Sequence, residues 1–458
     1  MNSRVAVIIC NWNKKDDVLR CIESVNKSTY KYLDIYVVDN ASTDDSVEVI
    51  KSLTYPLTLI QNERNLGGSG GFNAGLRTVF NKEYDYVMLL DNDVVLDTHA
   101  IQVLVETMDS DNSIGILGSK LYVLEETHQT NKLQEYGSYI DWETFNIKVL
   151  HKGEIDTNNL PELIKCDYVP ACSMMIRMEA LRRVGLFEEH YFIYWDDMEF
   201  GYLMNLHGYK VMACSKSKAW HKQGVKTHST TFSNYYFWRN RIHFFIKYIP
   251  LERIEQLAET LFRELYQVIY FSQFKGQMAT INTILFAFSD ALHHITGSAN
   301  EGRILDKEKS ANKVVSWISD NRVNSLLIID HGVNLVFLEN VIRDFEKHGI
   351  KIILQTKENK LDILNRYPTI IVFNEGEEIV TKVDKTIKIC EHILDIRDEV
   401  MVSQIDLYID QYSNLIVTNF DRKYIDNYEQ SFKLSSTWAI PYIKAQLLKA
   451  KQLITKGQ

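Results

Sequence analysis

The chain has 458 residues, 45% hydrophobic and 24% charged, as expected for a globular protein of two or three domains. The net charge of −9 argues against nucleic-acid binding through bulk charge. Six cysteines without a C-x-x-C pair argue against a zinc or disulfide framework and favour a reducing, cytoplasmic compartment. The N-terminal apolar run is too short for a signal peptide, and we expect no membrane-spanning segment.

Apolar strand patterns alternate with helical patterns over the first hundred residues. The predicted strands are Arg4–Cys10, Tyr32–Val38, Leu57–Gln61 and the apolar part of Tyr84–Asp97. The predicted helices between them start at Asp16, Ser46 and Asn73. This order predicts a parallel α/β sheet, in which ligands bind beyond the carboxyl ends of the strands.

Carboxylates follow two of these strands. Asp39 ends the second strand and is well placed to bind ribose hydroxyls, although Asp39, Ser42 or Asp44 could instead cap the next helix. Asp91 and Asp93 end the fourth strand, and two neighbouring carboxylates repel each other unless a cation lies between them. The pair therefore favours Mg²⁺ or Mn²⁺ with substrate phosphates, and a plain polar loop is the alternative.

Five glycines occur among residues 62–75. Glycine allows a positive φ and close approach of the backbone to a ligand. We predict a loop here whose amides bind an anion, with the N-terminus of a helix over Asn73–Phe80 behind it. No Gly-Lys-Ser/Thr follows, which excludes a Walker A loop, and a flexible surface loop is the alternative.

Three carboxylates, Asp196, Asp197 and Glu199, interrupt an aromatic stretch. Burial among rings would raise the pKa of a carboxyl group and make it a better base near neutrality. The alternative is a helix start with Asp196 as N-cap and Glu199 completing a capping box.

The scaffold before this stretch is predicted to contain a helix at Ala100–Met108 and a strand at Ile114–Val123. A hairpin flap is predicted at Tyr136–Ile155, followed by a strand–turn–strand at Cys166–Arg177.

Residues 210–250 contain eight Lys or Arg and no Asp or Glu, interleaved with aromatic residues. This composition favours a mobile basic loop that closes over a diphosphate and a face for an anionic lipid surface. An ordinary solvated face is the alternative. The segment begins with a predicted edge strand, Gly208–Met212, and contains His221 after Trp220.

Taken in order, these motifs resemble the family 2 glycosyltransferases of the GT-A fold. The resemblance covers residues 4–250 and is nearest to galactofuranosyltransferases and rhamnosyltransferases. It is carried by the Asn-Trp-Asn after the first strand, VVDNAST (Val37–Thr43), NLGGSGGFNAG (Asn65–Gly75), LLDNDVVLD (Leu89–Asp97) and the Trp-Asp-Asp at 195–197.

The resemblance implies an inverting transferase that moves galactofuranose, rhamnose or another hexose from a UDP- or dTDP-linked donor, using Mn²⁺ or Mg²⁺. The acceptor would be a hydroxyl of a glycan, lipid-linked or glycoprotein substrate in cell-surface assembly, with peripheral contact at the inner face of the cell membrane. Asp197 would be the base, with Asp196 and Glu199 orienting the acceptor or the helix; which of the two aspartates is the base stays open. The implied metal ligands are Asp91, Asp93 and His221. The implied donor-binding residues are Asn11, Asn13, Asp39, Asn40, Arg64, Asn65, Gly67, Gly68, Gly71, Asn73, Asp91, Asn92, Trp195 and Arg239.

A second α/β pattern begins near residue 321. The expected organisation is a GT-A domain over 1–250, a helical connector over 251–310 and a smaller Rossmann-like α/β domain over 311–458. The predicted strands of the last domain are Ser325–Asp330, Lys351–Thr356, Thr369–Phe373, Ile393–Asp398 and Leu415–Thr418, with helices at Asn334–His348 and Leu361–Arg366. No phosphate loop is recognisable there, so we expect an accessory domain for acceptor binding or homo-oligomer formation. A sugar-nucleotide-binding scaffold without catalysis is the alternative function of the whole chain.

Overall fold

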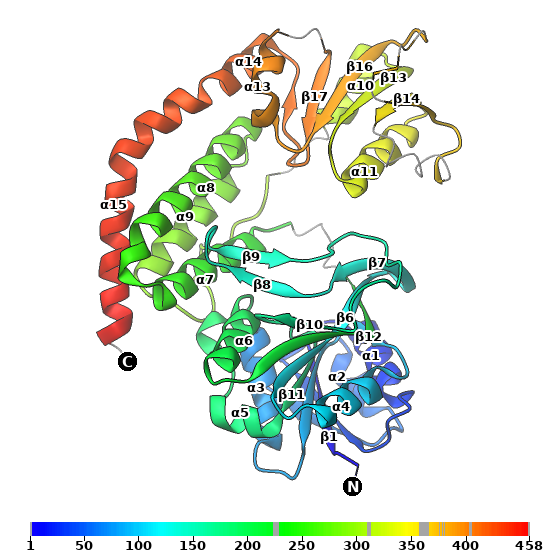
Figure 1. Ribbon diagram of the computed structural model, residues 1–458, viewed down its shortest axis with the longest axis vertical. Helices are drawn as coiled ribbons and strands as arrows, with labels where there is room; N and C mark the ends of the chain where they lie inside the picture. The colour runs from blue at the N-terminus through cyan, green and yellow to red at the C-terminus, as the bar shows by residue number, and fades with distance from the viewer. Residues whose placement is uncertain are drawn as a thin grey trace. The chain divides into compact units, whose positions relative to one another are not determined.

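The computed structural model describes residues 2–222, 229–308, 313–356, 366–374, 376–377, 379, 381–402 and 405–456. The chain forms two compact units, each with its own large sheet (Figure 1). The first unit comprises Met1–Thr260, Asn282–Asp306 and Lys444–Gln458, and the second comprises Leu261–Ile281 and Lys307–Ile443. The domain boundaries at residues 250 and 310 stay predictions.

The first unit is built on a mixed sheet in the order β10-β12-β6-β11-β4-β1-β2-β3. Its parallel strands are β1 (Val5–Asn11), β2 (Leu33–Asp39), β3 (Leu57–Gln61) and β4 (Tyr86–Asp91). The sheet continues through β11 (Ser173–Arg177), β6 (Ile114–Glu125), β12 (Lys210–Lys222) and β10 (Leu163–Cys166), with β5 (Val94–Leu96) on β12 and β7 (His128–Glu135) on β6. The predicted α/β class is confirmed.

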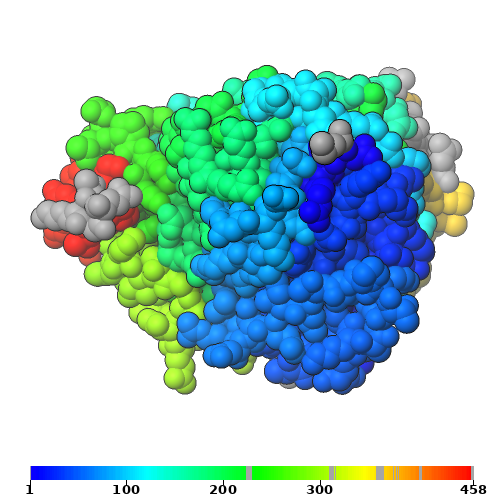
Figure 2. Space-filling model, turned by 90° about the horizontal axis from the view of Figure 1, so that it is seen from below, coloured from blue at the N-terminus to red at the C-terminus, as the bar shows by residue number. Residues whose placement is uncertain are grey.

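Helices cover both faces of this sheet because its central strands are apolar on both sides. Val5, Val7 and Ile9 of β1 face a core that includes α1 (Lys15–Asn26), α2 (Ser46–Lys51) and α4 (Ala100–Ser110). The alternate residues Ala6 and Ile8 face a core that includes α3 (Gly67–Val79), α5 (Met178–Val184) and α6 (Asp196–Leu206). In the space-filling view, the N-terminal part of the chain, drawn in blue, occupies much of the face shown (Figure 2).

The glycine-rich segment is helical, so the predicted loop is wrong. The helix α3 begins at Gly67, six residues earlier than expected, and contains all five glycines. A Cβ atom at Gly75 would lie 2.5 Å from Cγ2 of Ile8, and one at Gly71 would lie 2.4 Å from Sγ of Cys10. These glycines therefore allow the helix to approach β1 closely, which explains their number without a phosphate-binding loop.

A helix does start at Asp196, but the capping box given as the alternative for this stretch is not formed, and the predicted edge strand is wrong. Trp195, with φ of +70°, is the N-cap of α6, and neither Asp196 nor Glu199 takes part in a side-chain cap in the part of the chain described. The carboxylate of Glu199 instead accepts hydrogen bonds from Lys247 and Tyr248 on α7 (Phe232–Tyr248). The predicted edge strand is the start of β12, which is paired on both sides and extends through His221.

The basic segment 210–250 does not form the predicted charged face. Arg239 and Arg241 are buried and donate to backbone carbonyl groups of Tyr191 and Phe145, among others. Four lysines form ion pairs with acidic residues, in the pairs Lys210–Asp111, Lys216–Glu162, Lys222–Asp17 and Lys247–Glu199. Lys226 lies outside the described residues. The two arginines satisfy carbonyl groups in the core around α7, whereas Lys210 and Lys216 form ion pairs at the surface.

Helices and a hairpin complete the first unit. The hairpin of β8 (Ser138–Asp141) and β9 (Asn146–Val149) lies in the predicted flap, and its turn packs Trp142 against Phe244 and Phe245 of α7. The remaining helical elements are η1 (Glu189–Tyr191), η2 (Leu251–Arg253) and most of α9 (Met278–Leu292). The helix α8 (Ile254–Lys275) begins in this unit and belongs mostly to the second. No helix in the described ranges is long and apolar enough to cross a membrane.

The second unit has a sheet in the order β15-β14-β13-β16-β17-β18, parallel except for β18. Its strands are β13 (Ser325–His331), β14 (Lys351–Thr356), β15 (Ile371–Asn374), β16 (Lys385–Cys390), β17 (Leu407–Asp410) and β18 (Leu415–Ile416). Its helices include α10 (Lys313–Asn321), α11 (Leu335–Glu346), α14 (Asn419–Asp426) and most of α15 (Tyr428–Lys456). The predicted parallel sheet is confirmed.

One strand of this unit was predicted in the wrong place. Residues Ile393–Asp398 form a 3₁₀ turn (Ile393–Ile396) and the start of α13 (Arg397–Val402). The turn is held because the carboxylate of Asp410 accepts from the amide of Ile393 and the His392 ring accepts from that of Leu394. The predicted helix Leu361–Arg366 lies outside the described residues except for Arg366.

We expect Gly67→Ala to lower the free energy of unfolding by about 3 kcal/mol, because it combines a clash with a left-handed backbone. Gly67 has φ of +75°, and a Cβ there would lie 2.0 Å from the carbonyl oxygen of Phe192. Gly208→Ala is the matched control, since Gly208 has φ of +83° with nothing within 4 Å in the described structure. It should cost only about 1 kcal/mol. Urea unfolding compares the two, and equal losses would show that the close approach at Gly67 has no effect.

Candidate active site

Three parallel strands end in polar side chains that contact one another. Asn11 ends β1 opposite Asp39 of β2, and Cys10 lies opposite Asp91 of β4. The Asn11 side chain donates to Asp39 Oδ1 at 3.2 Å, and Asn92 donates to Asn11 Oδ1 at 2.8 Å. This buried polar chain fixes the carboxyl edge of the sheet, where open α/β sheets bind ligands.

The loop after β2 is tied to the loop after β1. Asp39 Oδ2 accepts from the amide of Ser42 at 2.9 Å, and Asn13 Oδ1 accepts from that of Thr43 at 2.6 Å. Asn13 has φ of +51°, a left-handed conformation that asparagine tolerates. Between these tied residues, the indole of Trp12 is 50% exposed, which leaves a ring face accessible. The sequence analysis did not select Trp12, although it lies inside the Asn-Trp-Asn motif.

Other residues predicted to bind the donor instead make hydrogen bonds that hold two segments of the protein together. Asn40 donates to Asn65 Oδ1 at 3.0 Å and to the Gly67 carbonyl at 2.9 Å, which joins the end of β2 to the start of α3. Asn73 exchanges hydrogen bonds with the backbone of Phe187, at 2.8 and 3.1 Å. Gly68 and Gly71 lie in the first two turns of α3, and Arg64 is exposed just before it.

The acidic cluster beyond β4 gathers around His221. Pairing of β12 with β5 places His221 opposite Val94. Its Nε2 lies 3.1 Å from Asp93 Oδ1 and 3.9 Å from Asp91 Oδ2. The Nδ1 atom lies 2.8 Å from the side-chain amide of Gln134, which orients the ring. Lys14 forms an ion pair with the other oxygen of Asp93 at 3.0 Å.

Burial and neighbouring charges shift the pKa values of Asp91 and Asp93 in opposite directions. Burial raises the pKa of Asp91 to about 6, with the charges of Asp93 and Asp196 adding to the effect. Burial also acts on Asp93, but His221 and Lys14 outweigh it and lower the pKa of Asp93 to about 2. Burial disfavours the charged form of His221, yet its contacts with Cys172 and Asp93 raise its pKa well above the ordinary value. The site therefore concentrates negative charge that a cation would stabilise.

The donor set fits a divalent cation that prefers oxygen and nitrogen ligands. Oxygen atoms of Asp91, the Sγ of Cys172 and a ring nitrogen of His221 lie within 4.8 Å of one another. Burial raises the pKa of the Cys172 thiol to about 11, so it stays protonated and is a poor ligand for Mg²⁺ or Mn²⁺. The residues that would hold such an ion are Asp91, Asp93 and His221, as the resemblance implies.

Asp197 lies at the same edge of the sheet. Its Oδ2 accepts from the amide of Ala171 at 3.3 Å, and the next residue, Cys172, accepts from the amide of Asp91 at 3.3 Å. Burial raises the pKa of Asp197 well above its ordinary value, and the charges of Asp196 and Glu135 add to this. Burial also raises the pKa of Asp196 to about 6. Asp197 and Asp91 are thus linked through two consecutive residues, Ala171 and Cys172.

Three predicted site residues have other contacts in the structure. Glu199 is bound to Lys247 at 2.8 Å and to the Tyr248 hydroxyl at 2.5 Å, which joins α6 to α7. Trp195 is fully buried against Phe237, Phe244 and Phe245. Arg239 donates to the carbonyl oxygens of Gly297 and Tyr191, so its guanidinium is directed into the core and not toward a phosphate.

Conversely, the structure adds residues that the sequence analysis did not select. Lys14 contacts Asp93, and Gln134 contacts His221. Glu135 is a carboxylate at the end of β7 whose pKa burial raises to about 7. Lys14 directly follows the Asn-Trp-Asn motif, which is a usable signal. The pairing of β7 with β6 brings Gln134 and Glu135 to the site. No motif near these residues in the sequence predicts that pairing.

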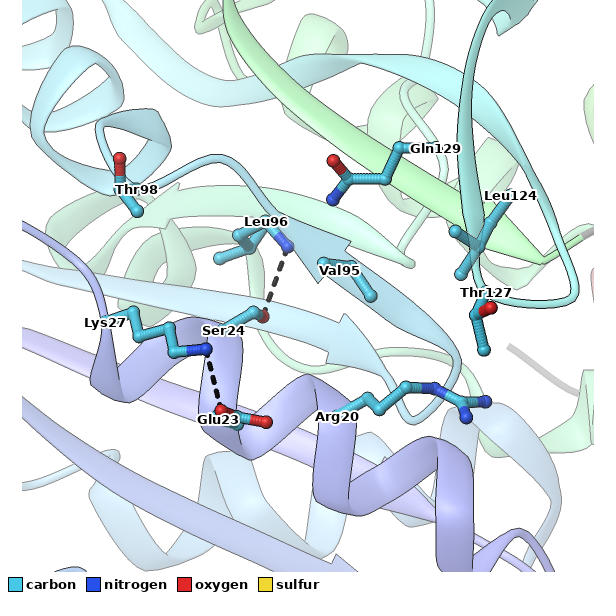
Figure 3. Close-up of a pocket in the computed structure, with 10 residues that line it drawn as sticks. All are labelled: Arg20, Glu23, Ser24, Lys27, Val95, Leu96, Thr98, Leu124, Thr127 and Gln129. Atoms are coloured by element: carbon cyan, nitrogen blue, oxygen red, sulfur yellow. Dashed lines mark hydrogen bonds and ion pairs between the residues drawn. The ribbon is translucent and has the colours of Figure 1, made fainter.

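Two cavities lie beside the cluster. The larger has about 430 Å³ and is lined by Asn13, Lys14, Lys15, Asp16, Asp17, Arg20, Asp44, Glu126, Thr127 and Lys222. Lys14 joins it to Asp93. The other has about 310 Å³ and lies between α1, β5 and the turn after β6 (Figure 3). There Glu23 pairs with Lys27, and Ser24 accepts from the Leu96 amide (Figure 3). The larger cavity is therefore the better candidate for a polar ligand.

Residues 6–185 match the glycosyl transferase family 2. The matched residues run from β1 to the end of α5, within the first unit. A glycosyltransferase of Haemophilus influenzae, otherwise uncharacterized, is 30% identical over 125 residues, 27% of this chain and 38% of its own length. Poly-beta-1,6-N-acetyl-D-glucosamine synthase of Staphylococcus aureus is 23% identical over 140 residues, 30% of this chain and 33% of its own. The match thus spans only 33% to 38% of the length of these curated relatives.

Two solved structures are similar to part of the chain. GalNAc-T7 with UDP, GalNAc and Mn²⁺ aligns with a TM-score of 0.44 at 16% identity, over 56% of this chain and 51% of that one. S. aureus TarS 1–349 in complex with UDP aligns with a TM-score of 0.39 at 16% identity, over 57% of this chain and 71% of that one. The family 2 match and the mixed sheet agree with the expected GT-A class.

We expect Asp93→Asn to weaken Mn²⁺ binding by roughly tenfold or more, because it removes a charged oxygen ligand. Asp97→Asn is the control, since Asp97 lies just after β5 and accepts from the amide of His99 outside the cluster. Electron paramagnetic resonance of free Mn²⁺ measures both variants. Equal affinity of Asp93→Asn and the unchanged protein would place the ion elsewhere.

Proposed function

We propose that the chain is an inverting, metal-dependent glycosyltransferase that moves a hexose from a nucleoside-diphosphate donor to a hydroxyl group of a glycan. The observation that supports this most directly is the meeting of Asp91, Asp93 and His221 with Asp197 at one edge of the sheet. Cation ligands and a basic carboxylate are the two features that such a reaction needs side by side.

The donor would lie across the ends of β1 and β2. Asp39 and Asn13 would contact the ribose or base, and the exposed ring of Trp12 offers a stacking surface for the base. Lys14 would leave Asp93 for a phosphate oxygen, since it already lies beside the metal ligands. A bound Mn²⁺ or Mg²⁺ would offset the charge that develops on the leaving diphosphate.

The acceptor would approach from the side of Asp197. The carboxylate of Asp197 would take the proton of the acceptor hydroxyl while that oxygen forms its bond to the anomeric carbon. The bond between this carbon and the diphosphate oxygen breaks in the same step, and its electron pair leaves with the diphosphate. In-line attack inverts the anomeric configuration. Burial of Asp197 supports this role because it raises the pKa of the carboxyl group and strengthens it as a base.

Galactofuranose or rhamnose is the donor sugar that we favour, because NLGGSGGF at Asn65–Phe72 most resembles those branches. A cell-surface polysaccharide is the favoured acceptor class, and the similarity to a polysaccharide synthase over 140 residues supports it. The second unit would serve acceptor binding or homo-oligomer formation. Screening nucleotide sugars for Mn²⁺-dependent hydrolysis would identify the donor.

We expect Asp197→Asn to reduce transfer by about a thousandfold while UDP–Mn²⁺ binding by isothermal titration stays unchanged, because the amide cannot accept the proton. Asp196→Asn is the comparison and should retain more activity, since Asp196 would position the acceptor. Full turnover by Asp197→Asn would remove this residue from the base role. Binding of UDP without hydrolysis or transfer by the unchanged protein would favour a scaffold over an enzyme.

A further inference from the structure

The long helix α15 is apolar on two opposite sides. Its inner side is buried and consists of Ala439, Ile443, Leu447, Ala450 and Ile454. Near its start, Tyr428 and Phe432 pack against Phe262 and Tyr266 of α8, alongside which α15 runs in Figure 1. This side accounts for the attachment of the helix to the protein.

The outer side carries large side chains that the protein does not cover. Leu434, Trp438 and Tyr442 follow one another at four-residue intervals and therefore lie on one face of the helix. They are 65%, 68% and 60% exposed. We call these three residues the outer stripe. A helix that is apolar on opposite sides is usually covered on both, so the outer stripe indicates a partner.

The helix that carries the outer stripe is itself basic, with Glu429 in its first turn as its one acidic residue. Residues 430–454 contain four lysines and no Asp or Glu, in a chain of net charge −9. Two of these lysines, Lys444 and Lys451, contact Glu255 and the backbone at Ile246. The other two, Lys433 and Lys449, are exposed. Lysines beside Trp, Tyr and Leu on one helix are typical of helices that lie in the interface of an anionic membrane.

The area of the outer stripe favours a membrane over a second copy of the chain as its partner. Three side chains of this kind, about two-thirds exposed, present on the order of 400 Å². Each partner in a stable dimer buries roughly 800 Å². Trp and Tyr rings, with an apolar body and a polar edge, match the headgroup level of a bilayer. We propose that the outer stripe of α15 docks the protein onto an anionic lipid surface. This inference does not depend on the proposed transfer reaction.

Vesicle co-sedimentation of the full chain tests the proposal. The probe is vesicles of equal parts phosphatidylglycerol and phosphatidylcholine, with pure phosphatidylcholine vesicles for comparison. The unchanged protein should bind the anionic vesicles, and Trp438→Ser/Tyr442→Ser should bind roughly tenfold more weakly. Lys433→Glu/Lys449→Glu should lose binding as well, and added salt should weaken binding of the unchanged protein.

Phe420→Ser is the matched control, because Phe420 is an aromatic residue of the same unit, 73% exposed, on α14 rather than on the outer stripe. It should bind as the unchanged protein does. Absence of binding to anionic vesicles, or equal binding by all variants, would overturn the proposal. A dimer in size-exclusion chromatography that Trp438→Ser/Tyr442→Ser dissolves would assign the outer stripe to a second copy and overturn it too. Far-ultraviolet circular dichroism establishes that each variant is folded.

Discussion

Burial of several carboxylates at one edge of a sheet is the constraint on which the site depends. Asp91, Asp93, Asp196 and Asp197 converge there with few cations to balance them. Burial also strengthens the repulsion between them because it removes the water that would screen it. Lys14 and His221 compensate Asp93, whereas Asp91 and Asp197 are left with raised pKa values. A site with this imbalance is suited to a cationic cofactor on one side and to proton transfer on the other.

The surrounding scaffold serves to hold these groups in place. Asn11, Asn40 and Asn73 each join two separate segments through side-chain hydrogen bonds, which tie strand ends, the start of α3 and the segment before Trp195 to one another. Close packing of α3 on β1 at Gly71 and Gly75 has the same effect. Residues that a sequence motif associates with ligand binding can therefore contribute by rigidity, which a fixed reaction geometry requires.

Sequence patterns predicted β1, β2, β3 and β4 well, because each is an apolar run with polar residues after it. They placed Asp39, Asp91, Asp93, Asp197 and His221 at positions that the fold brings to the same edge. The prediction for residues 67–72 was wrong because glycine is frequent both in loops and in helices that pack closely on a neighbour. The contacts of this segment with Ile8 and Cys10 show that close packing is the reason here, and they are visible only in the folded structure. Glu135 and Gln134 were missed because their relevance depends on strand pairing across the sheet. Arg239 and Glu199 were wrongly predicted to contact substrate. The sequence shows that they are charged, but it does not show which groups inside the protein they bind.

The central claim is that Asp91, Asp93 and His221 hold a divalent cation beside a nucleoside diphosphate and within reach of Asp197. A crystal of the full chain grown with Mn²⁺ and UDP, with anomalous diffraction recorded for manganese, tests this most directly. The account predicts a manganese peak bounded by these three side chains, with the diphosphate on it and Asp197 facing the open side. A peak at another place, or UDP bound without manganese at this cluster, would contradict the account.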